Sequence, residues 1–168
     1  RRVDAERQLR AFGRETGVTV AILRAPGIYA TDRLPIERLQ KRIPALRAED
    51  DVYTNHIHAD DLAAACVAAL VRARPGRAYN ASDDSGLRMG EYFDRVAEAF
   101  RLPKAPRVSR EEAEQQLSPV QLSFMRESRR LSNRRLKEEL GVHLAYPDVD
   151  AGISAALKEQ DERNQACS

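Results

Sequence analysis

The chain has 168 residues and a net charge of +2, from 28 basic and 26 acidic side chains. So small an excess gives no field that attracts polyanions, and we expect no nucleic-acid partner. No apolar run approaches the roughly 20 residues that cross a bilayer, so we expect no membrane partner and a soluble, cytoplasmic protein. The two cysteines cannot build a disulfide framework, and Cys66, in the apolar stretch AAACVAAL, is expected to be buried and reduced.

The first third of the chain predicts a helix, a strand and a long connection. Residues 1–13 have apolar positions at roughly helical spacing and a glycine at the end, which predicts an amphipathic helix. Residues 18–26, VTVAILRAP, are mostly apolar and β-branched, which predicts a parallel strand buried on both faces. Residues 28–55 contain two prolines and many charges and predict an excursion away from the sheet; connections of that length usually serve a function.

The middle of the chain predicts two helices with a short strand between them. Residues 62–73 are apolar enough to form a helix packed on a sheet, and Asp60 or Asp61 can cap it. Residues 77–83, RAYNASD, follow a Pro-Gly break and alternate like a strand. Residues 89–102 predict a helix with the apolar stripe Met89, Tyr92, Phe93, Val96, Ala97 and Phe100.

The last third is expected to be helical and polar. Ser109 and Glu112 form the pattern of a capping box at the start of a helix. Ser132 is a candidate cap and Gly141 a candidate terminator of another helix. The tail, GISAALKEQDERNQACS, is expected to fray.

Motifs that hold and use a dinucleotide are missing from these residues. A dinucleotide-binding turn needs the glycine spacing GxGxxG, and none of the eight glycines supplies it. A reductase of the tyrosine–lysine type needs a lysine four positions after a tyrosine, and none of the five tyrosines has one.

The densest polar cluster, NHIHADD, allows two interpretations. His56, His58 and Asp60 fit the first half of the HxHxD pattern of dinuclear metallohydrolases. However, Asp61 stands where that pattern requires histidine, and the chain has only three histidines. We therefore predict no metal and favour a strand end followed by helix-capping acids, with a ligand contact left open.

A basic run at residues 126–141 also has two interpretations. Its arginines could contact nucleic-acid phosphates: Arg129, Arg130, Arg134 and Arg135. Interleaved glutamates and an apolar edge of Leu131, Leu136 and Leu140 favour instead a surface helix that is structural or clamps a ligand.

Four stretches, in this order, resemble the C-terminal half of an extended short-chain dehydrogenase/reductase, the NAD-dependent epimerase/dehydratase family. They are VTVAILRAPGIYATDRLP, NHIHADDLAAACVAAL, RAYNASD and SRRLSNRRLKEELGVHLAYPDVDAGI, with Ala30 where the family has glycine. The resemblance implies an α/β fold: the C-terminal portion of a Rossmann-type parallel sheet plus a mostly helical substrate-binding subdomain. It also implies that the family's glycine-rich loop and catalytic tyrosine–lysine pair lie before Arg1, so we expect a fragment without catalytic residues.

The same resemblance implies a division of the chain and a set of site residues. Residues 1–30 would end the dinucleotide-binding domain, 31–55 would be a substrate-side excursion, 56–84 would return to the sheet, and 85–168 would be the mostly helical substrate-binding region. The family's segment after the sixth strand lies along the nicotinamide, which implies a cofactor wall of Ala25, Pro26, Gly27 and Ile28. Candidate contacts to an anionic or sugar-like substrate are Arg33, His58, Arg130 and Asn133.

Two functions from different classes follow. The first is the substrate-binding part of an NAD(P)-dependent epimerase/dehydratase or reductase acting on a nucleotide-sugar-like or related small molecule. It would be inactive alone, with NAD or NADP held in the full-length parent and not bound tightly by this chain. The second is a stand-alone binding module without catalysis. Partners would be the small-molecule substrate and a second copy or a complementing N-terminal half; a severed half should self-associate, whereas a module should be monomeric.

Overall fold

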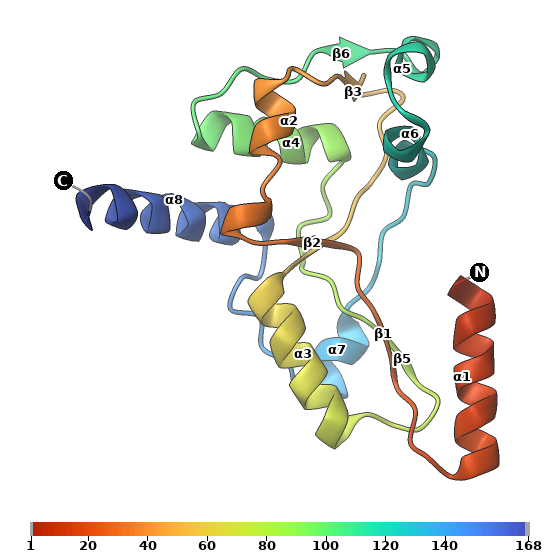
Figure 1. Cartoon of the computed structure of the whole chain (residues 1–168). Coiled ribbons are helices and arrows are strands. Elements are labelled where there is room, and N and C mark those ends of the chain that lie inside the picture. Colours follow the sequence, from red (N-terminus) through yellow and green to blue (C-terminus); the bar gives the residue numbers. More distant parts are fainter. Residues whose placement is uncertain (1, 167–168) are drawn as a thin grey trace.

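The computed structural model describes residues 2–166, which form short parallel strands and helices (Figure 1). Within these residues the strands make three separate parallel pairs. They are β1 (Ile22–Arg24) with β5 (Ala78–Asn80), β2 (Gly27–Tyr29) with β4 (His56–His58), and β3 (Ala45–Leu46) with β6 (Arg107–Val108). The α/β expectation is confirmed at this level, and the connections between parallel partners carry the helices.

Four helices are longer than ten residues in the described part of the chain: α1 (Arg2–Thr16), α3 (Ala59–Arg72), α4 (Met89–Ala99) and α8 (Val149–Ala166). The shorter ones are η1 (Thr31–Arg33), α2 (Ile36–Gln40), α5 (Arg110–Gln116), α6 (Pro119–Met125) and α7 (Arg134–Glu138). In Figure 1, α2, α4 and α8 lie together at one end, while α3 and α7 lie beside the β1–β5 pair, with α1 on its other side. None of the helices described is long and apolar enough to cross a membrane.

The strand predicted at residues 18–26 is wrong in both extent and burial. β1 covers only Ile22–Arg24, and Val18 is 52% exposed. A parallel strand becomes buried on both faces when helices cover both sides of a wider sheet, and in the described residues β1 belongs to a sheet of two strands, with β5 as its partner. Pro26, which has no N–H to donate, separates β1 from β2, and the chain moves there to a second pair.

The amphipathic stripe predicted on α4 is confirmed. Tyr92, Phe93 and Val96 are buried and pack against α8 through Val149 and Ile153. This packing also corrects the prediction that the tail frays, because α8 continues to Ala166 once its first turns have an apolar partner.

Gly152 in α8 allows a close approach between distant segments. A Cβ at Gly152 would lie 2.4 Å from the ring of Tyr29, and the Tyr29 hydroxyl donates to the carbonyl of Asp148 at 3.2 Å. The glycine therefore lets α8 pack directly on β2.

The helix predicted at 62–73 is confirmed as α3, but its predicted capping and burial are wrong. His58 is the N-cap, and its Nδ1 accepts from the Asp60 N–H at 3.3 Å. Asp61 instead accepts hydrogen bonds from a distant backbone segment, described below. Cys66 is exposed, because α3 buries Ala65 and turns its next residues outward.

The capping box of Ser109 and Glu112 is confirmed at the start of α5. The helix predicted within 126–141 is shorter, since α7 covers only Arg134–Glu138 and has Asn133, not Ser132, at its N-cap position. Gly141 adopts a φ of +64°, as expected for a residue that follows a helix. The residues before α7 are extended because they pair with another segment, which brings them to the site.

Candidate functional site

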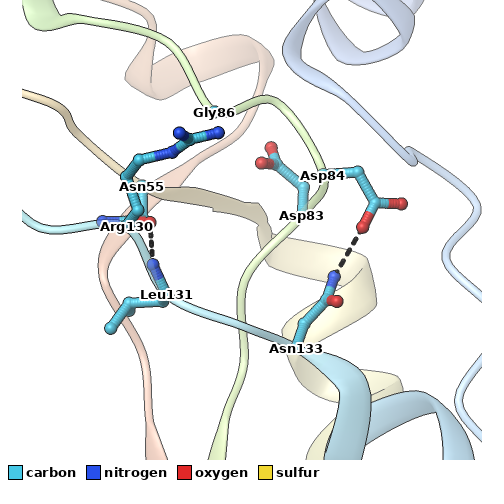
Figure 2. A pocket seen from close by; sticks show the side chains of 7 residues that line it. All are labelled: Asn55, Asp83, Asp84, Gly86, Arg130, Leu131 and Asn133. Carbon is cyan, nitrogen blue, oxygen red and sulfur yellow. Dashed lines mark hydrogen bonds between the residues drawn. The ribbon is translucent and has the colours of Figure 1, made fainter.

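Two pockets lie on either side of the extended segment that leads into β4. The first, which we call the polar pocket, encloses about 170 Å³ (Figure 2). It is lined by Asn55, Asp83, Asp84, Gly86, Arg130, Leu131 and Asn133. The second, which we call the aromatic pocket, encloses about 200 Å³. It is lined by Thr54 and His56 together with Gly27, Ile28, Tyr29, Arg33, Pro35, Met89, Tyr92 and Phe93. Side chains on extended backbone alternate in direction, so neighbouring residues of one short segment serve different pockets.

Asn55 holds the strap formed by residues 126–133 against this segment. Its Nδ2 donates to the carbonyl of Arg129 at 2.8 Å, and its Oδ1 accepts from the N–H of Leu131 at 2.9 Å. The Tyr53 N–H donates to the hydroxyl of Ser128 at 3.1 Å. These bonds satisfy the backbone without a helix and place Arg130, between the two anchored residues, at the mouth of the polar pocket.

Asn133 and Asp84 tie the start of α7 to the loop after β5. Asn133 Nδ2 donates to the carbonyl of Ser82 and to Asp84 Oδ1, each at 2.8 Å. Lys137 donates to both oxygens of Asp84 at 2.6–2.7 Å. Burial by itself raises the pKa of Asp84, but the hydrogen bonds from Lys137 and Asn133 outweigh it and hold that pKa below its usual value.

Asp83 differs from its neighbour in burial and in partners. It is 7% exposed, and its Oδ1 accepts from the Ser85 N–H at 3.0 Å. Its Oδ2 is buried and has no hydrogen-bond partner among the described residues. Burial, with the negative charges of Asp84 and Asp148, raises the pKa of Asp83 to about 6. Figure 2 shows its carboxyl group turned toward the side of the pocket that holds Arg130.

The aromatic pocket contains a buried neutral imidazole. The ring of His56 lies 4.2 Å from that of Tyr92 and 6.2 Å from that of Tyr29, between centroids. Burial lowers the pKa of His56 to about 4, so the ring is neutral at physiological pH. His56 Nδ1 has no hydrogen-bond partner in the described part of the chain. Burial, followed by the charge of Asp83, raises the pKa of Tyr92.

The structure distributes the predicted site residues over both pockets. Gly27, Ile28 and Arg33 line the aromatic pocket, and Arg130 and Asn133 line the polar pocket. Ala25 and Pro26 precede β2 and line neither of them. These assignments to cofactor and substrate stay predictions.

His58 lines neither pocket, although its ring contacts that of Tyr29 at 5.3 Å between centroids. It is 6% exposed, its ring stacks on Tyr146 at 3.7 Å, and its Nδ1 caps α3. His56 faces Tyr92 instead. In residues 2–166, no group of three or more potential ligands lies close enough to hold a metal ion.

Sequence reasoning did not assign Asp83, Asn55, His56 or Tyr92 to a site. One usable pattern was available for Asp83, which closely follows the carboxyl end of a parallel strand, where ligands of open α/β sheets bind. Tyr92 belonged to an apolar stripe and His56 to the polar cluster NHIHADD, and neither position by itself indicates a pocket.

Comparison with known proteins gives matches among solved structures alone. No family model matches the chain, and no curated protein does. A functionally unknown conserved protein from Silicibacter pomeroyi is 32% identical, with a TM-score of 0.81 over 94% of this chain and 54% of that one. A nucleoside-diphosphate-sugar epimerase from Pseudomonas aeruginosa is 21% identical, with a TM-score of 0.75 over 95% of this chain and 53% of that one.

A third solved structure that matches this chain is a dehydratase. The dTDP-glucose 4,6-dehydratase from Bacillus anthracis, solved in complex with NAD, is 14% identical, with a TM-score of 0.68 over 96% of this chain and 50% of that one. The chain thus spans about half the length of the structures that it matches. Its fold is that of roughly half of these epimerase and dehydratase structures.

Proposed function

We propose that this chain is the substrate-binding part of an NAD(P)-dependent epimerase/dehydratase or reductase that acts on a nucleotide-sugar-like small molecule. One observation carries the proposal. The two pockets follow the carboxyl ends of the paired strands β1 and β5, in a chain that has the fold of half of such structures. Ligands of Rossmann-type sheets bind outside the carboxyl ends of their strands.

The residues after β1 suit one side of a cofactor site. Gly27 and Ile28 are exposed, and a Cβ at Gly27 would lie 3.2 Å from the carbonyl oxygen of Asn55, so a glycine keeps this wall flat. The chain has no glycine-rich turn for a pyrophosphate. We therefore propose that a companion segment, in the same polypeptide or another, holds NAD or NADP and provides the proton donor, while this chain forms the nicotinamide wall.

Each pocket has one arginine that suits an anionic substrate. Arg33 is exposed beside the aromatic pocket, and Arg130 lies at the polar pocket. Guanidinium groups bind phosphates through paired hydrogen bonds. The Nδ2 of Asn133 is committed to Ser82 and Asp84, so its Oδ1 is the atom that would meet the substrate.

The first test is the intact mass of the natural protein in its source cells, detected with an antibody against α8. A mass near twice the 18.9 kDa of this chain is expected, and cofactor and substrate assays would then use that longer protein. A mass equal to that of this chain, together with no NAD(P) consumption in the presence of a purified N-terminal half, would favour the binding module.

The second test places the substrate. In the longer protein, Arg33→Ala is expected to raise KM for a sugar nucleotide such as UDP-glucose or dTDP-glucose by about tenfold, the effect of losing one charge-assisted contact. Asn133→Ala is expected to raise KM by about threefold, because the amide oxygen makes a neutral hydrogen bond. Arg47→Ala is the control, because Arg47 pairs with Glu112 on the surface and lines neither pocket. An unchanged KM in both variants would remove these residues from the substrate site.

A further inference from the structure

Buried polar atoms without partners gather at the wall between the two pockets. Among the described residues such atoms lie on five side chains, and three of these are His56, Ser82 and Asp83. The three are neighbours, since the Asp83 N–H donates to the carbonyl of His56 at 2.7 Å. Nearly all buried polar groups in folded proteins have a hydrogen-bond partner. Of the three residues, Asp83 lines the polar pocket, so its Oδ2 indicates that a molecule other than this chain completes the bonding there.

Only part of the polar pocket is free to bind that molecule. Both the Nδ2 and the Oδ1 of Asn55 bond to the strap, and Asp84 is held by Lys137 and Asn133. Arg130 stacks over the ring of Tyr53 at 5.0 Å, and no ion pair joins it to a carboxylate in residues 2–166. The pocket thus combines one buried acceptor without a partner, Asp83 Oδ2, with one cation, the guanidinium of Arg130, beside the Oδ1 of Asn133.

This pair selects the chemistry of the ligand. A hydroxyl group can donate to the carboxylate while a negative group of the same molecule meets the guanidinium. A nucleobase is less suited, because bases bind by stacking on aromatic side chains, and the lining of the polar pocket contains none. A metal cation is disfavoured by the adjacent positive charge of Arg130.

We propose that the polar pocket binds a polyhydroxylated anion, such as a sugar phosphate or a sugar acid, with Asp83 as the residue that recognises a hydroxyl group and Arg130 as the one that meets the negative group. The inference deepens the proposed function and rests on it for the class of substrate. It assigns the hydroxyl-bearing part of that substrate to this pocket.

Ligand binding should then depend on the ionisation of Asp83. Burial, Asp84 and Asp148 hold the pKa of Asp83 near 6, whereas the guanidinium of Arg130 faces it with the opposite charge. His56 is neutral throughout this range because burial lowers its pKa to about 4. The ionised carboxylate is the better acceptor, so affinity should fall as pH decreases through 6.

The experiment is an NMR titration of this chain with glucuronate and with acetate, which carry the same charge and differ in hydroxyl groups. The amides of Ser85 and Leu131 report on the pocket, since they donate to Asp83 and Asn55. We expect glucuronate to bind about tenfold more tightly than acetate near neutral pH. Asp83→Asn should abolish that preference, and Arg130→Gln should weaken both ligands.

Asp94→Asn is the matched control, because Asp94 also has a buried unpartnered oxygen but pairs with Arg107 away from the pocket. Glucuronate carries a constant charge between about pH 5 and pH 7.5, so a wild-type titration across this range tests the same contact without any substitution. The wild-type affinity for glucuronate should fall toward the acidic end.

The outcomes separate this inference from the proposed function. A glucuronate preference near neutral pH that survives Asp83→Asn, or a wild-type glucuronate affinity that does not change with pH, would overturn the inference and leave the KM test of the proposed function standing. The absence of any glucuronate shift at Ser85 and Leu131 would overturn it as well. A preference that Asp83→Asn removes, in a protein whose longer form turns over no sugar nucleotide, would support the pocket and reject the proposed function.

Discussion

Asp83 and His56, which lie next to each other at the wall between the pockets, respond to pH in opposite ways. The pKa of Asp83 is raised by burial from 3.8 to about 6, so the folded chain keeps a proton that the unfolded chain has lost, and stability falls as pH rises through that window. The pKa of His56 is lowered from 6.5 to about 4, so stability falls as pH decreases through its window. In the wild type, the effects of Asp83 and His56 on the free energy of unfolding offset each other between about pH 4 and pH 6.

Removing the Asp83 charge should therefore stabilise the protein, and only above its pKa. We expect Asp83→Asn to raise the free energy of unfolding by about 1–3 kcal/mol near pH 7.5 and to have little effect near pH 4, where the wild-type carboxyl is already protonated. Urea unfolding at both pH values measures the difference. An equal change at both would show that the charge of Asp83 carries no folding cost.

Stability lost to an unpartnered carboxylate is typical of a binding residue, since function is a common reason to keep a costly group.

The sequence pattern at the start of α3 does not determine which side chain caps the helix. His58 and Asp61 both belong to the cluster NHIHADD, yet His58 caps α3 and Asp61 does not. Which acceptor a free N–H finds depends on side-chain direction, and the sequence does not specify that.

At the scale of elements, Asp61 fastens α3 to the segment that precedes α8. Its Oδ1 accepts from the Ala145 N–H at 2.8 Å and its Oδ2 from the Tyr146 N–H at 3.0 Å. Asp61 is 2% exposed, so water cannot replace these bonds. Tyr146 in turn stacks on His58, which links the same segment to β4.

We expect Asp61→Asn to lower the free energy of unfolding by about 2–4 kcal/mol, because an amide can accept only through one oxygen and its NH₂ group would face the buried N–H groups. Asp60→Asn is the matched control, since the Asp60 side chain is 75% exposed, and it should change stability by less than about 0.5 kcal/mol. Urea unfolding near neutral pH compares them. Equal effects would mean that Asp61 does not fasten these elements.

At the scale of the whole molecule, several apolar surfaces have no cover within residues 2–166. β1 pairs along one edge only, and α3 exposes Val67, Leu70 and Val71 by 65%, 88% and 82%. Large exposed apolar patches mark interaction surfaces, and unpaired strand edges bind other strands. These surfaces are expected to contact the companion segment of the proposed function.

This chain by itself should accordingly self-associate and bind a hydrophobic dye. Size-exclusion chromatography with light scattering is expected to show species larger than 18.9 kDa. Leu70→Lys should reduce dye binding while changing the free energy of unfolding by less than about 0.5 kcal/mol, because Leu70 is 88% exposed. A monomer that binds no dye would favour the stand-alone module.

The sequence by itself determined the local features of this protein. The stripe of α4, the capping box of α5 and the glycine after α7 followed from residue spacing and backbone preference, which act between near neighbours. The tertiary structure decided what depends on distant partners: the short β1 with one neighbour, the extended strap that carries Arg130, and the outward face of Cys66. It also left Asp83 without a partner, since burial and bonding arise only when segments remote in sequence meet.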